Sequence, residues 1–225
     1  SQSGNRLSLD LAAPTSNSEK QLAWEARHRT RAGIASIVGA LGLFIYFALQ
    51  QVISRDAPTA ASGLDTFARV QRPGSIDSLP SLAIPYFEYI HEKAPLFIVM
   101  GITASLGFIG LAWSAGFLAV ATRARAPSFK RWQIYLPIIG GVVLGLSLLL
   151  LYVSQMIQVN NFLDGPRTVR TAQDVEGGAF AYARLLGFLG ALVLAIGLIL
   201  VSVNAMRVGL LTKLFGFLGI VAGAM

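Results

Sequence analysis

The sequence predicts an all-α polytopic transmembrane helical bundle, with four complete spans and the start of a fifth. Of its 225 residues, 54% are hydrophobic and only 13% are charged, whereas a soluble domain carries about 25% charged residues. Four long stretches contain neither a charged residue nor a histidine, and each exceeds the roughly 20 residues needed to cross a hydrocarbon core. They predict spans at about 32–54, 96–122, 132–158 and 185–206.

The segment before the first span is basic and differs in composition from the rest. Residues 1–31 are expected to be a cytoplasmic tail, in which 19–31 form an interfacial helix with Trp24 at headgroup level. The remainder, 32–225, is expected to be one transmembrane domain. Its last apolar run, 214–225, has 12 residues and is too short to cross alone, so we expect it to be the start of a fifth helix.

The charges between the spans predict the orientation. Residues 1–31, 123–131 and 207–213 hold 11 basic and three acidic residues, whereas 55–93 and 164–184 hold seven basic and eight acidic ones. By the positive-inside rule this split, +8 against −1, predicts a multi-pass cell-membrane protein with a cytoplasmic N-terminus. The formal charge of +7 is therefore interpreted as an orientation signal, not as nucleic-acid binding. Residue usage suggests a bacterial inner membrane.

The two outer loops are expected at 55–95 and 159–184. Prolines divide the first loop into short elements, which we expect around 64–71 and 84–93. The second element carries Tyr86, Phe87 and Tyr89, which are expected to anchor it at the membrane surface, as Trp132 does at the start of the third span. The alternative is that this element forms a lip over a lipid or substrate site.

The sequence contains no recognisable catalytic, metal or cofactor site. The four spans contain no Asp, Glu, Lys, Arg or His, which disfavours a proton relay or a charge-coupled transporter. The chain has no cysteine and only two histidines, His28 and His91, so we expect no metal, haem or other cofactor. An enzyme would have to use outer-loop residues such as Glu88 and His91.

Small residues spaced four apart occur in all four spans. Such spacing lets helix backbones approach closely in lipid, and it predicts a compact bundle without deciding between packing within one chain and packing between chains. The glycines expected at these contacts are Gly39, Gly101, Gly116, Gly141, Gly145 and Gly187.

A few polar or aromatic residues inside the spans are candidates for ligand binding. Trp113 falls near the middle of the second span, and Tyr152, Gln155 and Gln158 share one face of the third. The alternative for Trp113 is core packing, and for the other three it is hydrogen bonding between helices.

A shift of 82 residues superimposes Arg125 on Arg207, which indicates a weak internal repeat.

These patterns favour a non-catalytic integral membrane protein, an accessory or assembly subunit of a membrane complex or homo-oligomer. Its expected partners are the lipid bilayer and other protein subunits or copies of itself. The alternative is a carrier or binding protein for a neutral or lipid-like substrate, with the tentative site at Trp113 and the Tyr152 face. A membrane-embedded enzyme is the third hypothesis.

Overall fold

The computed structural model describes residues 16–58, 80–126 and 128–224. Within them the chain forms helices and no strand, so the predicted all-α class is confirmed. The helices in chain order are α1 (Ser16–Asp56), α3 (Ile84–Glu92), α4 (Ala94–Arg125), α5 (Arg131–Asp164), α6 (Val169–Val175), α7 (Gly178–Arg207) and α8 (Lys213–Ala224).

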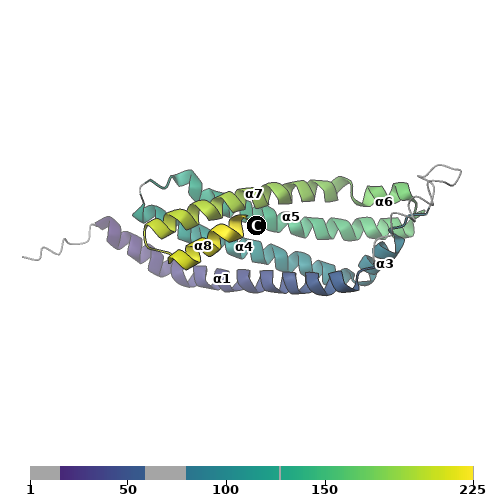
Figure 1. Cartoon of the computed structure of the whole chain (residues 1–225), viewed down its shortest axis with the longest axis horizontal. Coiled ribbons are helices and arrows are strands. Elements are labelled where there is room, and N and C mark those ends of the chain that lie inside the picture. Colours follow the sequence, from purple (N-terminus) through teal and green to yellow (C-terminus); the bar gives the residue numbers. More distant parts are fainter. Residues whose placement is uncertain (1–15, 59–79, 127, 225) are drawn as a thin grey trace, which may run out of the picture.

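Four of these helices are long and apolar enough to cross a membrane. They are α1, α4, α5 and α7, and they run side by side along the long axis of the molecule (Figure 1). The sequence predicted four complete spans, and the structure has four helices of the required length and composition. The apolar helix α8 is shorter, with 12 residues, and turns back along α7 (Figure 1).

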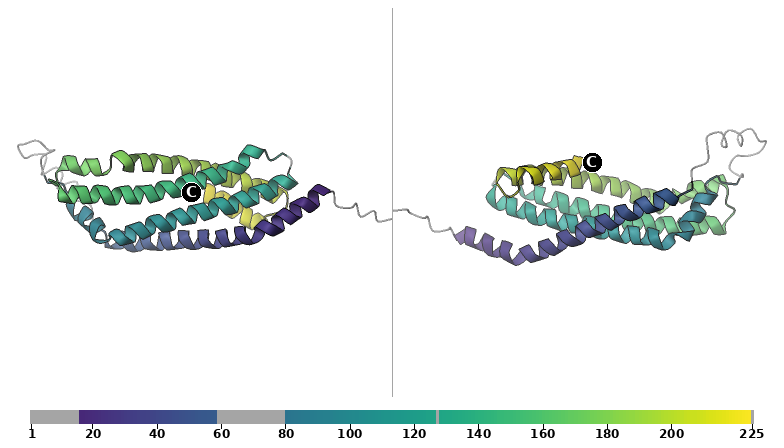
Figure 2. Two further views of the ribbon diagram at one scale, coloured as in Figure 1. Left: turned by 180° about the vertical axis from the view of Figure 1, so that it is seen from behind. Right: turned by 60° about the horizontal axis from the view of Figure 1, so that its bottom comes forward.

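The long helices pack in the order in which they occur in the chain. Each of α1, α4 and α5 packs extensively against the next long helix, and α8 packs against α7. This order leaves α1 on the margin of the molecule, with α4 as its principal neighbour (Figure 2). Only 17% of the apolar window of α1 is buried, against 44% of that of α4, so α1 is the least covered of the four.

The ends of the helices differ from the sequence prediction in two places. The expected interfacial helix at 19–31 and the first span form one continuous helix of 41 residues, α1. The expected loop at 159–184 is largely helical, because α5 continues to Asp164, α6 follows, and α7 begins at Gly178. Charged residues delimit a hydrocarbon span, but they do not end a helix, because Lys, Arg and Glu are good helix formers.

The short helices α3 and α6 cover one end of the molecule (Figure 1). The predicted element at 84–93 is confirmed as α3, whereas the element at 64–71 lies outside the described residues. The largest core cluster lies at this end, where Phe87 and Ile90 of α3 pack among α4 and α5 side chains such as Phe97 and Val159. A smaller cluster around Phe129 lies at the opposite end.

The order of the helices repeats with the same 82-residue offset as the sequence. Helices α4 and α7 end at Arg125 and Arg207, and α5 and α8 begin at Arg131 and Lys213, so both boundaries recur after 82 residues. A short helix precedes each unit, α3 before α4 and α6 before α7. The described structure is therefore two successive units of the same helix order, with α1 added in front.

Candidate functional site

The candidate site lies where α1 and α4 cross. Gly39 and Gly42 of α1 face Gly107 and Gly110 of α4 so closely that a Cβ on any of them would press against the other helix. A Cβ on Gly42, for example, would lie 2.8 Å from the carbonyl oxygen of Thr103. Such an approach is possible only where side chains are absent.

A short hydrogen-bonded chain lies next to this crossing. The Ser36 hydroxyl donates to that of Ser114 over 2.8 Å, and the Ser114 hydroxyl donates to the Gly110 carbonyl oxygen over 2.9 Å. The two helices are thus joined by a polar contact inside their apolar stretches.

Trp113 lies beside this crossing and faces outward. Its side chain is 58% exposed, which contradicts the core-packing interpretation of the sequence. It forms part of the wall of two neighbouring apolar grooves, of about 230 and 360 Å³. The first is lined by Trp24, His28, Ile109, Ala112, Trp113, Gly116, Phe117, Val120, Ile138 and Val142. The second is lined by Arg31, Ile34, Ala35, Val38, Leu106, Ile109, Gly110 and Trp113.

An aromatic stack closes one end of the first groove. The Trp24 ring stacks on Phe117 of α4 with centroids 5.7 Å apart, and the His28 ring stacks on Trp24 with centroids 4.6 Å apart. The His28 Nδ1 lies 2.9 Å from the Trp24 carbonyl oxygen, which can only accept, so Nδ1 carries the proton. Trp24, expected at a membrane surface, therefore also joins α1 to α4.

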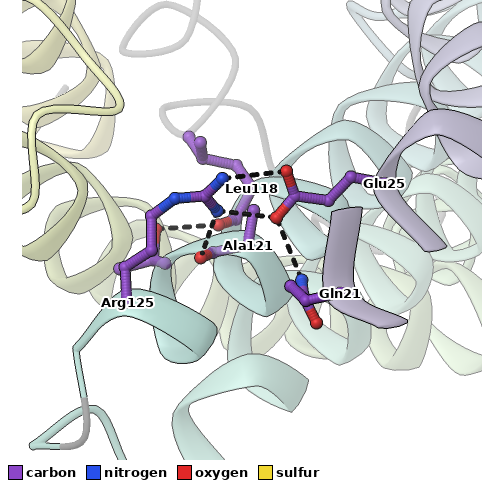
Figure 3. Close-up of polar contacts among 6 residues, drawn as sticks. Gln21, Glu25, Leu118, Ala121 and Arg125 are labelled. Atoms are coloured by element: carbon purple, nitrogen blue, oxygen red, sulfur yellow. Dashed lines mark hydrogen bonds and ion pairs between the residues drawn. The ribbon is translucent and has the colours of Figure 1, made fainter. Parts of the chain in front are cut away.

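An ion pair holds the same end of the two helices together (Figure 3). The Arg125 guanidinium donates to both oxygens of the Glu25 carboxylate, over 2.6 and 2.9 Å, and Gln21 donates to the same carboxylate over 3.0 Å. Both charged residues lie beyond the uncharged stretches of their helices. The Arg125 guanidinium, followed by Gln21, holds the pKa of the Glu25 carboxyl below its ordinary value, against the opposing effect of partial burial.

This ion pair was not predicted from the sequence. Glu25 is one of the few acidic residues in the basic tail, with Gln21 one helical turn before it. That spacing is the only signal that the sequence offers, because the partner Arg125 is 100 residues away.

The Tyr152 face does not form a site together with Trp113. Tyr152 is 9% exposed and belongs to the core cluster at the α3/α6 end. It packs on Gly101 of α4, which lies 12 residues, or about 18 Å along the helix, from Trp113. Gln158 points toward Gly177, its amide nitrogen 3.5 Å from that carbonyl oxygen, and Gln155 is half-buried.

The expected surface anchors divide into two kinds. Tyr86 and Trp132 are exposed, at 40% and 54%. Phe87, by contrast, is buried against Phe162 with ring centroids 4.8 Å apart, so its expected place on the surface is corrected. Tyr89 turns inward as well and donates its hydroxyl to the Ile53 carbonyl oxygen at 2.9 Å, which fixes α3 to the end of α1.

A polar pocket of about 420 Å³ lies at the α3/α6 end. It is lined by Glu88, His91, Asn160, Leu163, Asp164 and Arg167. Glu88 and His91 do not pair with each other: Arg167 binds Glu88 over 3.2 Å, and the His91 ring nitrogen lies 2.8 Å from Asn160 Oδ1. The outer-loop pair considered for catalysis is thus held by residues of α5 and of the α5–α6 connection.

Arg167 has an unusual backbone in this pocket. Its φ of +53° lies in the left-handed region, which a non-glycine residue adopts at a cost. Its carbonyl oxygen accepts from the Ser81 N–H over 2.9 Å, and its Nε donates to the Leu163 carbonyl oxygen over 2.8 Å. Arg167 therefore connects the segment before α3 with the end of α5.

The six glycines expected at packing contacts all lie at contacts between helices of this one chain. A Cβ on each would meet the neighbouring helix: Gly39 meets α4, Gly101 meets Tyr152 of α5, Gly116 meets Ile138, Gly141 meets Ala112, Gly145 meets Ser105, and Gly187 meets Ser147. No group of three or more acidic or histidine side chains suited to a metal ion occurs in the described part of the chain.

The grooves beside Trp113 and the polar pocket at the α3/α6 end are thus the candidate sites. No protein-family model, curated protein or solved structure matches this chain.

Proposed function

We propose that the protein is a non-catalytic multi-pass membrane protein that serves as an accessory or assembly subunit of a larger complex or homo-oligomer. The carrying observation is that no buried side-chain nitrogen or oxygen in the described residues lacks a hydrogen-bond partner. Thr103, Ser147 and Asn204, for example, donate to carbonyl oxygens of their own helices.

The distribution of charge supports the same proposal. A proton or ion path normally needs charged or readily titrating groups at depth, and the four uncharged stretches hold no Asp, Glu, Lys, Arg or His. The basic residues at the Glu25/Arg125 end and the mixed charges at the α3/α6 end favour a cytoplasmic N-terminus in a cell membrane.

The outward face of α1 is the place where we expect another subunit. This helix has α4 as its principal neighbour and the smallest buried share of the four long helices. Four strongly exposed side chains of its apolar stretch follow the spacing of one helix face, i, i+3, i+7 and i+10. They are Ile34, Ile37, Leu41 and Phe44, each between 56% and 72% exposed.

The test is the mass of the purified protein in a mild detergent, corrected for bound detergent. We expect a defined assembly larger than the 24.0 kDa chain, and a smaller species for the Ile37→Ala/Phe44→Ala variant. The matched control is Leu185→Ala/Phe188→Ala on the exposed face of α7, at 56% and 66% exposure, which should leave the mass unchanged. A stable, folded monomer of the unaltered chain would overturn the proposal.

A second candidate function is the binding of a lipid-like ligand, and the grooves at Trp113 favour it. Their walls are almost entirely apolar and open to the outside, as a hydrocarbon chain requires. A polar neutral substrate is less well supported, because the Tyr152 face packs into the core cluster.

A further inference from the structure

We propose that the groove lined by Arg31 and Trp113 binds one anionic membrane lipid, with its acyl chain along α1 and α4 and its headgroup at Arg31. This inference rests on the second candidate function and assigns the class of ligand and the residue that selects it.

The lining of the groove suits a single hydrocarbon chain. On α1 it extends from Arg31 to Val38, seven residues or about 10 Å of helix. Every lining residue other than Arg31 is apolar. The groove therefore combines an apolar surface with one charge at its end, as an acyl chain with a charged headgroup requires.

The close crossing of α1 and α4 forms the floor of this groove. Gly110 contacts Gly39 and Ala35 backbone atoms there, so no side chain fills the space between the helices. Ile34, Val38 and Leu106 supply the apolar walls, and the exposed Trp113 ring borders the groove on α4.

Arg31 is the one charged residue of the lining, and it lies at one end. Among the described residues it forms no ion pair or hydrogen bond through its side chain, in contrast to Arg125 nearby, which is paired with Glu25. It is also the last charged residue before 23 uncharged ones. An unpaired guanidinium at the mouth of an apolar groove complements a phosphate above an acyl chain.

The surroundings strengthen the preference for a net negative headgroup. Arg27, Arg29 and Arg123 lie at the same end of the two helices, and each basic residue near an anionic membrane surface adds to the attraction. A zwitterionic headgroup carries its own cation and gains less from this field.

The experiment uses the tryptophan fluorescence of the full chain in vesicles. Trp24→Phe and Trp132→Phe leave Trp113 as the only tryptophan, since the chain has three. Phosphatidylglycerol with brominated acyl chains is titrated against phosphatidylcholine brominated in the same way, because bromine quenches tryptophan only on contact. We expect phosphatidylglycerol to reach half-maximal quenching at a mole fraction about fivefold lower than that needed for phosphatidylcholine.

Two variants assign the selectivity to Arg31. In the same single-tryptophan background, Arg31→Gln should reduce the preference to less than twofold, and Arg29→Gln, an exposed arginine outside the lining, should retain most of it. Circular dichroism checks that each variant is folded. Retained preference in Arg31→Gln would overturn the assignment of the headgroup.

The two levels of the proposal fail in different ways. Equal quenching by both lipids, well above that expected from their mole fractions, would overturn the anionic selectivity and leave the lipid-binding function standing. Quenching that only follows the mole fraction of either lipid would overturn both.

Discussion

Gly110 of α4 lies directly against Gly39 of α1, and a Cβ built on Gly110 would be 2.7 Å from the Gly39 Cα. The same Cβ would be 2.7 Å from the Ala35 carbonyl oxygen. Both contacts are with backbone, which cannot rotate away as a side chain does. The close approach of α1 to α4 at this crossing therefore requires a residue without a side chain at position 110.

Gly110→Ala is expected to destabilise the protein by about 1–3 kcal/mol, because α1 must move away from α4. The measurement is the thermal unfolding midpoint in detergent. Gly33→Ala is the matched control on α1, since a Cβ there meets nothing within 4 Å, and it should not lower the midpoint. Equal midpoints for Gly110→Ala and the unaltered chain would contradict the crossing described.

The Glu25–Arg125 pair is expected to contribute about 1 kcal/mol, because it is bidentate and the Glu25 side chain is only 19% exposed. A double-mutant cycle with Glu25→Gln and Arg125→Gln measures this coupling. Glu19 is an exposed carboxylate of the same helix. Glu19→Gln therefore serves as the control, and its coupling energy with Arg125→Gln should be too small to measure.

Acid should weaken the same pair. The folded-state pKa of Glu25 is lowered by Arg125, so the pair stabilises the protein above the ordinary glutamate pKa of about 4.3. This contribution is lost as the pH falls through the lower folded-state pKa. The stability of Glu25→Gln should accordingly depend less on pH in this range than that of the unaltered protein, and identical profiles would show that the pair does not titrate in folding.

Tyr89→Phe should cost about 1 kcal/mol, because it removes the hydroxyl that donates to the Ile53 carbonyl oxygen and leaves that acceptor without this partner. The exposed Tyr86 supplies the control variant Tyr86→Phe, which should be close to neutral. Protease cleavage of the connection between α1 and α3 reports the loosening directly, and equal cleavage rates for the two variants would argue against the contact.

At Arg167 two substitutions separate backbone strain from the ion pair. Both Arg167→Ala and Arg167→Gly remove the contact with Glu88, but only glycine relieves the left-handed φ of +53°. The glycine variant should therefore be more stable than the alanine variant by about 1 kcal/mol. Thermal unfolding of the two proteins decides this, and a more stable alanine variant would contradict the assigned backbone.

The fold class follows from the sequence because a charge inside hydrocarbon is costly, so the uncharged stretches coincide with long apolar helices. The faces of those helices do not follow, because a helix that is apolar all round shows no hydrophobic stripe. Trp113 was therefore open to a core interpretation, although its ring faces outward. Phe87 was open to a surface interpretation, although it is buried.

The positions of small residues indicated which helix faces contact one another, which hydrophobicity did not. Glycines four apart pointed to the helix faces that approach one another, and Gly39, Gly141 and Gly145 do lie at contacts with α4. The grooves beside Trp113 could not be predicted, because they depend on how α1 crosses α4. Neither could the Arg125–Glu25 pair, whose members are 100 residues apart.

The marginal position of α1 has a consequence for synthesis. Its principal partner, α4, begins at Ala94, long after α1 has ended at Asp56. In the proposed membrane topology we expect α1 to enter the bilayer before α4, as independently stable helices do before they associate. Lipids would then already surround α1 when α4 packs against it and completes the open groove at Arg31.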